Sequence, residues 1–288
     1  MTTLFRIMGA LVIAASLSVS LGAQWPSHPT PDVPRKDGKP ILDGPAPRTP
    51  EGKVDFSGIW NRFGGGGGGG RGRAGGGPPP PTTTADGIPL STFGEVAGRG
   101  FALPLQPWAA ELKKRRMADN NKDNPDVWCL PIGLMQYHNH PQPRQIVQTK
   151  NLILITYESN YGLRYIYMDG RPAPNNDPTP WWFGYSRGWF EGDTLVVETT
   201  NFRGDERAGW LDVNGSPYTE ALKMTERFRR PNFGTLEIDV TIDDPKAYTK
   251  PFTVRVNQRI MVDQEMIEFI CNENEQSSKH IEPPKKPL

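Results

Sequence analysis

The sequence holds few of the residues that most often carry enzyme chemistry: its 288 residues include two cysteines and four histidines. It also lacks a surplus of either charge, because 33 lysines and arginines nearly balance 32 aspartates and glutamates, for a net charge of +1. A protein that binds nucleic acid or an anionic membrane usually carries a basic surplus or a basic block. The composition therefore predicts no nucleic-acid partner, and no motif in the chain predicts a cofactor.

Long hydrophobic runs are missing after residue 21, and the run near the start has the form of a targeting segment. Arg6 supplies a positive charge, Ile7–Leu21 is apolar, and small residues lead to Ala23. This pattern is typical of a Sec signal peptide, and the apolar run is too short to span a membrane. We expect a signal peptide over 1–23, cleavage near Ala23, a periplasmic or extracellular mature protein, and no integral membrane segment after cleavage.

The expected export bears on the oxidation state of the two cysteines. Free thiols are rare in an oxidising compartment, so Cys129 and Cys271 are expected to form a disulfide. The bond would close a loop of 142 residues (271 − 129). In the chain-entropy account a loop of that length corresponds to about 4–5 kcal/mol of stability. A catalytic thiol would need a histidine partner that no motif here specifies.

Composition divides the mature chain into segments. Proline and glycine (30 and 31 residues) gather in the first third, where little apolar surface is available for burial. The glycine run that begins at residue 64 lacks the strand, the helix and the GK[ST] ending of a phosphate-binding loop, so we expect a flexible insertion there. The predicted segments are a proline-rich arm (24–53), a first strand (54–63), this insertion (64–87), a linker with one helix (88–128), a β-barrel core (129–276) and a tail (277–288).

Strand patterns dominate after residue 145, and one helix is expected before them. Pro107 suits the first turn of a helix over Gln106–Asn120, and good helix formers follow it. From Trp181 to Phe202 an aromatic run, a turn around Gly192 and a β-branched run predict a hairpin. Strands are expected over Val54–Arg62, Gln145–Lys150, Leu152–Ser159, Leu163–Asp169, Trp182–Phe190, Thr194–Thr200, Ala221–Arg229, Thr235–Asp243, Phe252–Met261 and Ile267–Asn272.

These elements predict a mainly β fold, an antiparallel up-and-down barrel of eight or nine strands with one short helix and long disordered N-terminal segments. Many strands alternate apolar and polar residues, as Leu236, Ile238 and Val240 do with the acidic residues between them. Closing such a sheet removes its exposed edges. Because no helices lie between the strands, parallel pairing is not expected.

Two resemblances follow from short stretches of sequence. Gly58-Ile59-Trp60, on a first strand ahead of a barrel, resembles the G-x-W motif of lipocalins, in which the tryptophan packs across the closed end of the barrel, often against a late arginine. DFSGIW, MDGR, GYSRGWFEGDTLVVETTNF, TERFRR, TIDDPKAYTKPF and EFICNENEQ are similar to a large family of exported, uncharacterised proteins of soil bacteria, over roughly Val54–Gln276. That resemblance implies export and no particular activity. Its members often carry a histidine after DGR-P, where this chain has Ala173.

Polar residues on the inward faces of the strands are the best site candidates. Glu226 shares its face with apolar residues such as Phe228, and a slip of one residue would bury positive charges instead. Arg164 and Gln258 fall on apolar faces in the same way. A buried carboxylate must be paired or protonated, so we expect Glu226 to pair with Arg164 or Arg187. Such a pair serves either to fix the barrel or to form a polar patch in a ligand site.

The QYHNH segment contains the remaining candidate for metal chemistry. His138 and His140 would lie on one side of an extended segment. Zinc or copper would need a third and a fourth ligand, with Glu158 or Asp169 as weak possibilities at no distinctive spacing. We therefore predict no metal site and expect two loop histidines.

Tyrosine and tryptophan suit the mouth of a cavity because they present an apolar body and a polar tip, although they also suit a plain core. We predict an exported barrel that binds a small, largely apolar molecule. The predicted ligand-binding residues are Tyr157, Arg164, Trp182, Tyr185, Trp189, Glu226 and Gln258. Two alternatives stay open. One is a hydrolase or lyase on the same barrel, with Glu226 as acid or base and His138 as helper. The other is a structural or envelope-interaction module whose barrel is filled by side chains.

Overall fold

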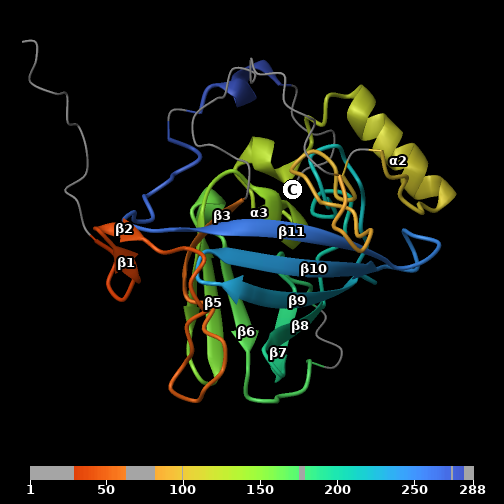
Figure 1. Cartoon of the computed structure of the whole chain (residues 1–288). Helices are drawn as coiled ribbons and strands as arrows, with labels where there is room; N and C mark the ends of the chain where they lie inside the picture. Colours follow the sequence, from red (N-terminus) through yellow and green to blue (C-terminus); the bar gives the residue numbers. More distant parts are fainter. Residues whose placement is uncertain (1–28, 63–81, 99, 175–178, 274, 282–288) are drawn as a thin grey trace, which may run out of the picture.

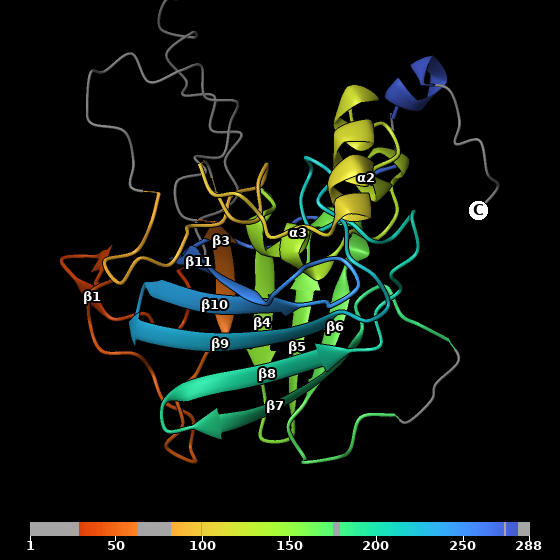
Figure 2. The same cartoon turned by 90° about the vertical axis from the view of Figure 1, so that its right-hand side faces the viewer.

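A computed structural model gives the fold of residues 29–62, 82–98, 100–174, 179–273 and 275–281. The predicted mainly β fold is confirmed, because nine strands of the described chain form a closed barrel in the order β10-β11-β3-β4-β5-β6-β7-β8-β9 (Figure 1, Figure 2). The barrel strands are β3 (Gly58–Arg62), β4 (Arg144–Gln148), β5 (Leu152–Tyr157), β6 (Leu163–Tyr167), β7 (Tyr185–Glu191), β8 (Thr194–Thr200), β9 (Lys223–Asn232), β10 (Thr235–Asp243) and β11 (Phe252–Met261).

Alternation gives the barrel strands an inward and an outward face. On β9 the side chains of Met224, Glu226, Phe228 and Arg230 are buried, and those between them are half-buried. Across the sheet, Val240 of β10 lies opposite Glu226, so an apolar residue and the carboxylate share the interior. The register predicted for Glu226 is confirmed, because Glu226 is buried whereas Lys223, Arg227 and Arg229 lie on the outward face.

One strand pair contradicts the prediction that all pairing is antiparallel. β6 and β7 run parallel, with Ile166 opposite Ser186 and Tyr167 opposite Arg187, and the other barrel pairs are antiparallel. The connection over 168–184 is long enough to return the chain to the end of the barrel where β6 begins, which a tight turn cannot do. We term this place, where only two residues of each strand are paired, the β6–β7 seam.

β3 closes the barrel between β11 and β4. Its Trp60 has no exposed surface, and the indole N–H donates to the carbonyl oxygen of Phe56 at 2.9 Å. The guanidinium carbon of Arg230 lies 4.8 Å from the centre of the Trp60 ring. A late arginine packed on this tryptophan is the arrangement that the G-x-W resemblance implied.

The described chain contains one helix that was predicted and one that was not. α2 (Pro107–Ala118) lies where the helix was expected. α3 (Leu134–Asn139) was not expected, and its six residues are all buried. Figure 2 shows α3 at the upper end of the barrel, near β4, β5 and β6. The 3-10 helices are η1 (Pro125–Trp128), η2 (Ser159–Tyr161) and η3 (Ser277–His280).

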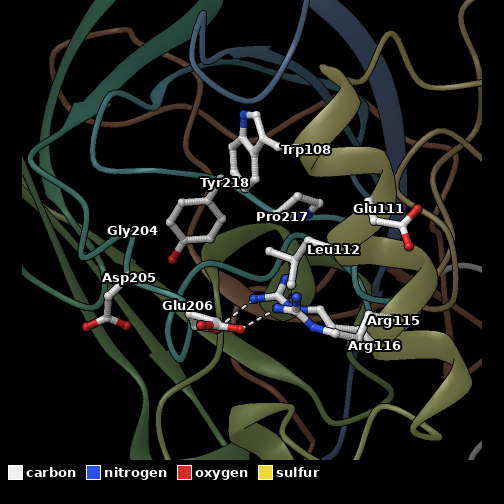
Figure 3. Close-up of a pocket in the computed structure, with 10 residues that line it drawn as sticks. All are labelled: Trp108, Glu111, Leu112, Arg115, Arg116, Gly204, Asp205, Glu206, Pro217 and Tyr218. Atoms are coloured by element: carbon white, nitrogen blue, oxygen red, sulfur yellow. Dashed lines mark hydrogen bonds and ion pairs between the residues drawn. The ribbon is translucent and has the colours of Figure 1, made fainter.

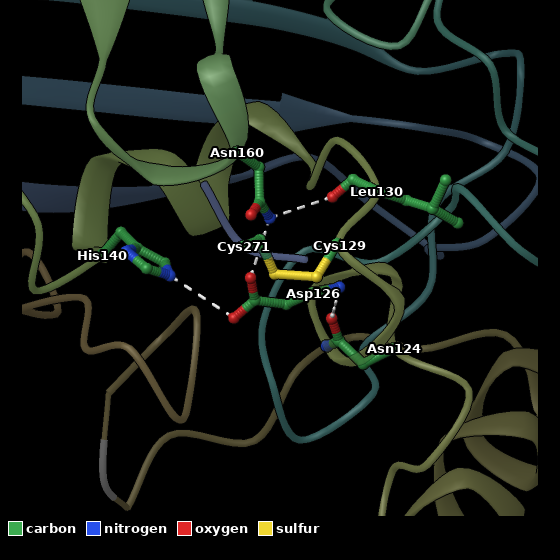
Figure 4. The surroundings of a disulfide bond; sticks show 7 residues. All are labelled: Asn124, Asp126, Cys129, Leu130, His140, Asn160 and Cys271. Carbon is green, nitrogen blue, oxygen red and sulfur yellow. Dashed lines mark hydrogen bonds and ion pairs between the residues drawn. A yellow bond between two sulfur atoms is a disulfide. The ribbon is translucent and has the colours of Figure 1, made fainter. Parts of the chain in front are cut away.

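The prediction of a last strand over Ile267–Asn272 is wrong, because these residues form no strand. β11 already pairs with β3 on that side, so the closed barrel leaves no free edge for another strand. Ile267 is instead exposed at 52 %. The segment brings Cys271 to Cys129, which follows η1, and the predicted disulfide is confirmed with a Cα–Cα distance of 5.4 Å (Figure 4). Beside it Asn160 donates to a carboxylate oxygen of Asp126 at 2.9 Å.

The described part of the proline-rich arm follows the surface of the barrel. It contains a small antiparallel pair, β1 (Arg35–Lys36) and β2 (Lys39–Pro40). Farther along, Arg48 donates to both carboxylate oxygens of Asp193, at 2.8 Å each, and this attaches the arm to the turn between β7 and β8. Because both side chains are more than half exposed, the pair adds little stability and mainly sets the path of the arm.

The predicted signal peptide, most of the predicted glycine-rich insertion and most of the predicted tail lie outside the described residues. Among the helices that the structure describes, none has both the length and the apolar character needed to cross a membrane.

Candidate ligand-binding site

Glu226 is the centre of a polar cluster enclosed in the barrel. Its carboxylate accepts hydrogen bonds from both Nη groups of Arg164, with Nη1 3.0 Å from Oε1 and Nη2 in short contact with Oε2. Arg164 also donates to the hydroxyl oxygens of Ser186 at 3.0 Å and Thr199 at 2.8 Å. The predicted pairing is therefore confirmed with Arg164, whereas Arg187 pairs with a carboxylate on the outer face.

His138 enters the same cluster from α3. Its Nε2 lies 2.6 Å from a carboxylate oxygen of Glu226, and its Nδ1 lies 3.1 Å from Nη1 of Arg144. A guanidinium group can only donate, so Nδ1 accepts and Nε2 carries the proton that is donated to Glu226. The imidazole is therefore neutral, and burial lowers the pKa of His138 to about 4 despite the neighbouring carboxylate.

Arg144 of β4 holds α3 against the barrel. Its guanidinium donates to the carbonyl oxygens of Tyr137 and His138, each at 3.1 Å, and to the side chain of Gln258 at 3.0 Å. Gln258 in turn donates to the carbonyl oxygen of His138 at 3.0 Å. Desolvation lowers the pKa of Arg144 to about 10, so it stays charged at neutral pH. The cluster thus fixes the end of α3 inside the barrel.

The chemistry open to this cluster is limited by its burial. Burial raises the pKa of Glu226, but the combined effect of Arg164 and His138 is larger and lowers the pKa to about 2. A carboxylate and an imidazole within hydrogen-bond reach form the usual pair for general acid–base catalysis. Here the two side chains are 0 % and 1 % exposed, and the second imidazole nitrogen is bonded to Arg144. The geometry is that of a structural network.

A groove lies on the outer surface at the β6–β7 seam, with a volume of about 330 Å³, within the range of small-molecule pockets. Leu163, Tyr165 and Tyr167 on the outward face of β6 form one wall. The opposite wall is formed by Pro180–Ser186, the segment that leads into β7 and includes its first two residues. Because the two strands pair at only two positions, the first residues of β6 are not paired with β7 and side chains flank the opening. We term this hollow the aromatic groove.

Four aromatic rings stand in a row along the aromatic groove. The ring centres of Tyr165 and Tyr167 are 6.5 Å apart, and those of Tyr167 and Tyr185 are 5.1 Å apart. Trp181 continues the row at 5.4 Å from Tyr185. Tyr165 and Trp181 are 46 % and 39 % exposed. Apolar surface gathered in one exposed hollow marks interaction sites on soluble proteins.

Two guanidinium groups stack on rings of the aromatic groove. The guanidinium carbon of Arg171 lies 4.0 Å from the ring centre of Tyr167, and that of Arg203 lies 4.8 Å from the ring centre of Trp182. Each arginine also pairs with an aspartate two positions away in the chain. The groove therefore combines an apolar lining with positive groups that flank it.

A second cavity, of about 440 Å³, lies between α2 and the 204–218 segment (Figure 3). Arg115 and Glu206 form an ion pair at its edge. Arg116 donates to three backbone carbonyl groups, so its donors are engaged within the protein. The aromatic groove is the better candidate although it is smaller, because four neighbouring aromatic rings line it.

The structure does not bring the seven predicted ligand-binding residues into one site. Four are buried in the interior: Tyr157, Arg164, Glu226 and Gln258. Trp182 and Tyr185 line the aromatic groove, and Trp189 is exposed at 43 % farther along β7. Tyr185 and Trp189 occupy outward positions, because Ser186 and Gly188 take the inward positions of β7.

The two histidines of QYHNH have different partners. His138 bonds to Glu226, whereas His140, the residue after α3, lies 3.4 Å from Asp126. The segment is helical up to Asn139 and not extended, so the two imidazoles do not share a side. Within the described residues, no group of three or more His, Cys, Asp or Glu side chains is placed to hold a metal ion.

Sequence reasoning did not single out Arg144, Tyr165, Tyr167, Trp181 or Arg203. The sequence does show that Tyr165 and Tyr167 lie on an outward face, because they flank the inward Ile166 and side chains alternate along a strand. Nothing local connects these rings with Trp181, which comes from the other side of the seam.

Comparison with protein-family models, with curated proteins and with solved structures finds no match. The resemblance to exported bacterial proteins therefore stays a prediction.

Proposed function

We propose that this barrel is a binding protein that takes a small, largely apolar, ring-shaped molecule into the aromatic groove. The observation that carries the proposal is the row of rings from Tyr165 to Trp181, exposed in a hollow of about 330 Å³. Covering these rings with a ligand removes apolar surface from water, and each ring contact adds about 0.5–1.5 kcal/mol.

The proposed ligand site lies on the outer surface of the barrel and not in its interior, which the inward polar residues of the sequence favour. The inward side chains of β9 and the residues of α3 are buried against one another, and α3 is bonded in place through Arg144. An enzyme on this barrel would need a substrate to reach Glu226 or His138, whose side chains are at most 1 % exposed. The interior is better suited to support the groove than to act on a ligand.

The predicted export fits a role in binding molecules met outside the cytoplasm. The disulfide between Cys129 and Cys271 is of the kind that persists in oxidising compartments. Together with the signal-peptide pattern of the first 23 residues, it favours a periplasmic or extracellular place for the protein.

Titration calorimetry with the neutral two-ring probe 2-naphthamide tests the proposal. We expect binding to the unmodified protein and about tenfold weaker binding to Trp181→Ala, because that change removes one ring from the row. The matched control is Trp189→Ala. It removes an equally exposed tryptophan from the outer face of β7, outside the groove, and should leave the dissociation constant within about twofold.

Equal weakening by the two tryptophan variants, or no binding to the unmodified protein at millimolar probe, would contradict a ligand site in the groove. Native mass spectrometry of protein purified from its natural source gives an independent test. A retained small molecule should be present in the unmodified protein and missing from Trp181→Ala.

A further inference from the structure

Arg203 stands beside the aromatic groove in a position suited to a negative charge. Its backbone N–H donates to the carbonyl oxygen of Trp181 at 2.8 Å, which fixes the start of the side chain at the groove wall. Its guanidinium carbon lies 4.8 Å from the ring centre of Trp182, and its Nε donates to Asp205 at 2.6 Å. Within the described part of the chain, its two Nη groups are bonded to no other residue.

Stacking determines what those two Nη groups can bind. A guanidinium group that lies over an indole ring directs its N–H bonds within its own plane, away from the ring face. Two such groups side by side match the two oxygens of a carboxylate, and the resulting charge-assisted pair is stronger than a neutral hydrogen bond. Arg203 therefore offers a carboxylate a two-point contact beside an apolar, ring-lined floor.

Arg171 adds a second positive group but is a weaker anchor. It covers one face of Tyr167, with its guanidinium carbon 4.0 Å from the ring centre. Its Nε and Nη2 both donate to the carboxylate of Asp169, so fewer of its donors remain for a ligand. Because arginines already cover a face of Tyr167 and of Trp182, those ring faces are not available to a cationic ligand.

We infer that the ligand of the aromatic groove is an amphipathic anion. It combines a planar or alicyclic ring, which packs along Tyr165, Tyr167 and Trp181, with a carboxylate that accepts from the Nη groups of Arg203. This inference rests on the proposed function of the groove. Beyond that function, it specifies that the ligand is negatively charged and that Arg203 selects for this charge.

The test compares two probes that differ only in charge, naphthalene-2-carboxylate and 2-naphthamide, by titration calorimetry at low salt. We expect the unmodified protein to bind the carboxylate about tenfold more tightly than the amide. Arg203→Gln should weaken binding of the carboxylate about tenfold and binding of the amide much less, so that the preference is lost. Raising the salt concentration should reduce the preference, because the contact is partly exposed to solvent.

Arg207→Gln is the matched control. It removes the same charge four positions along the chain, in a side chain that stacks on none of the described rings of the groove, whereas Arg203 stacks on Trp182. This variant should preserve the preference for the carboxylate. Equal affinity for the two probes, or equal effects of the two arginine variants, would overturn the inference while leaving the groove as a site for neutral rings. Failure of both probes to bind would instead contradict the proposed function itself.

Discussion

The enclosed cluster around Glu226 and the aromatic groove are built from similar residues and differ in what those residues contact. In the cluster, both arginines donate to fixed acceptors of the protein, and the side chains are almost fully buried. In the groove, Arg203 stacks on a ring and keeps donors unused within the described chain, and two of the rings are exposed. The donors of the first place are used within the protein, whereas the second keeps exposed rings and donors that a ligand could use.

This difference separates stability from recognition. A buried polar group that has its hydrogen bonds is costly to disturb but has nothing left to offer a second molecule. An exposed ring or an unused donor contributes little to folding and is available for binding. Variants in the interior should therefore change unfolding and leave groove binding alone, and variants in the groove should do the opposite.

The largest expected effect on stability comes from the disulfide, which lies outside both the cluster and the groove. Replacing Cys129 and Cys271 with alanine releases a closed loop with a sequence separation of 142. The free energy of unfolding should fall by about 4–5 kcal/mol if the loss is entropic. Urea unfolding of the double variant and of the oxidised parent measures this. Naphthamide binding by the folded variant should match the parent, and a variant as stable as the parent would contradict the prediction.

Glu226→Gln should cost nearly as much. The change leaves Arg164 buried without its carboxylate, and breaking a buried pair in this way typically costs about 3–5 kcal/mol. Urea unfolding measures the loss. Glu191→Gln is the control, because it removes a carboxylate from an exposed ion pair with Arg227 and should leave the unfolding midpoint unchanged. A Glu226→Gln protein that unfolds like the parent would remove the argument that this pair stabilises the interior.

The inward residues of the barrel could be predicted from the sequence because the alternation of apolar and charged residues along a strand shows which face is buried. On β9, Lys223, Arg227 and Arg229 share the outward face, so the register that buries Glu226 keeps these three positive charges out of the core. The requirement that a buried carboxylate be paired then points to an arginine on another inward face. Arg164 satisfies that requirement from β6.

The helix α3 and the aromatic groove could not be predicted in the same way. α3 has six residues, all buried, so it shows no alternation between an apolar and a polar face. The groove joins the outward face of β6 to the chain before β7 through a parallel pairing of two positions. Long-range pairing of this kind leaves no mark in either stretch alone, and the long 168–184 connection permits a parallel return without requiring one.

Acid should weaken the interior in two steps. The pKa of His138 is about 4 in the folded protein against 6.5 ordinarily, and that of Glu226 is about 2 against 4.5. Both groups bind protons more readily when unfolded, so stability is fully present above the ordinary pKa and is lost as the pH falls through each interval. The His138 step, between pH 6.5 and about 4, is on the order of 3 kcal/mol.

His138→Gln isolates the first of these steps. Glutamine can donate to Glu226 and accept from Arg144 but does not titrate. Urea unfolding at a series of pH values should show a smaller loss of stability for the variant between pH 6.5 and 4 than for the parent. Parallel curves for the two proteins in that interval would contradict the assignment of the step to His138.

The smallest expected effect on stability is in the groove. Tyr165 is 46 % exposed, so Tyr165→Ala should change the free energy of unfolding by no more than about 0.5 kcal/mol. The same variant should bind 2-naphthamide about three- to tenfold more weakly, because the row loses its outermost ring.

Tyr165→Phe keeps the ring and removes the hydroxyl group, and should bind like the parent. If the phenylalanine variant weakens binding as much as the alanine variant, the hydroxyl group and not the ring contacts the probe. If the alanine variant is instead markedly less stable, Tyr165 belongs with the interior, and the separation between stability and recognition fails at the residue where it should be clearest.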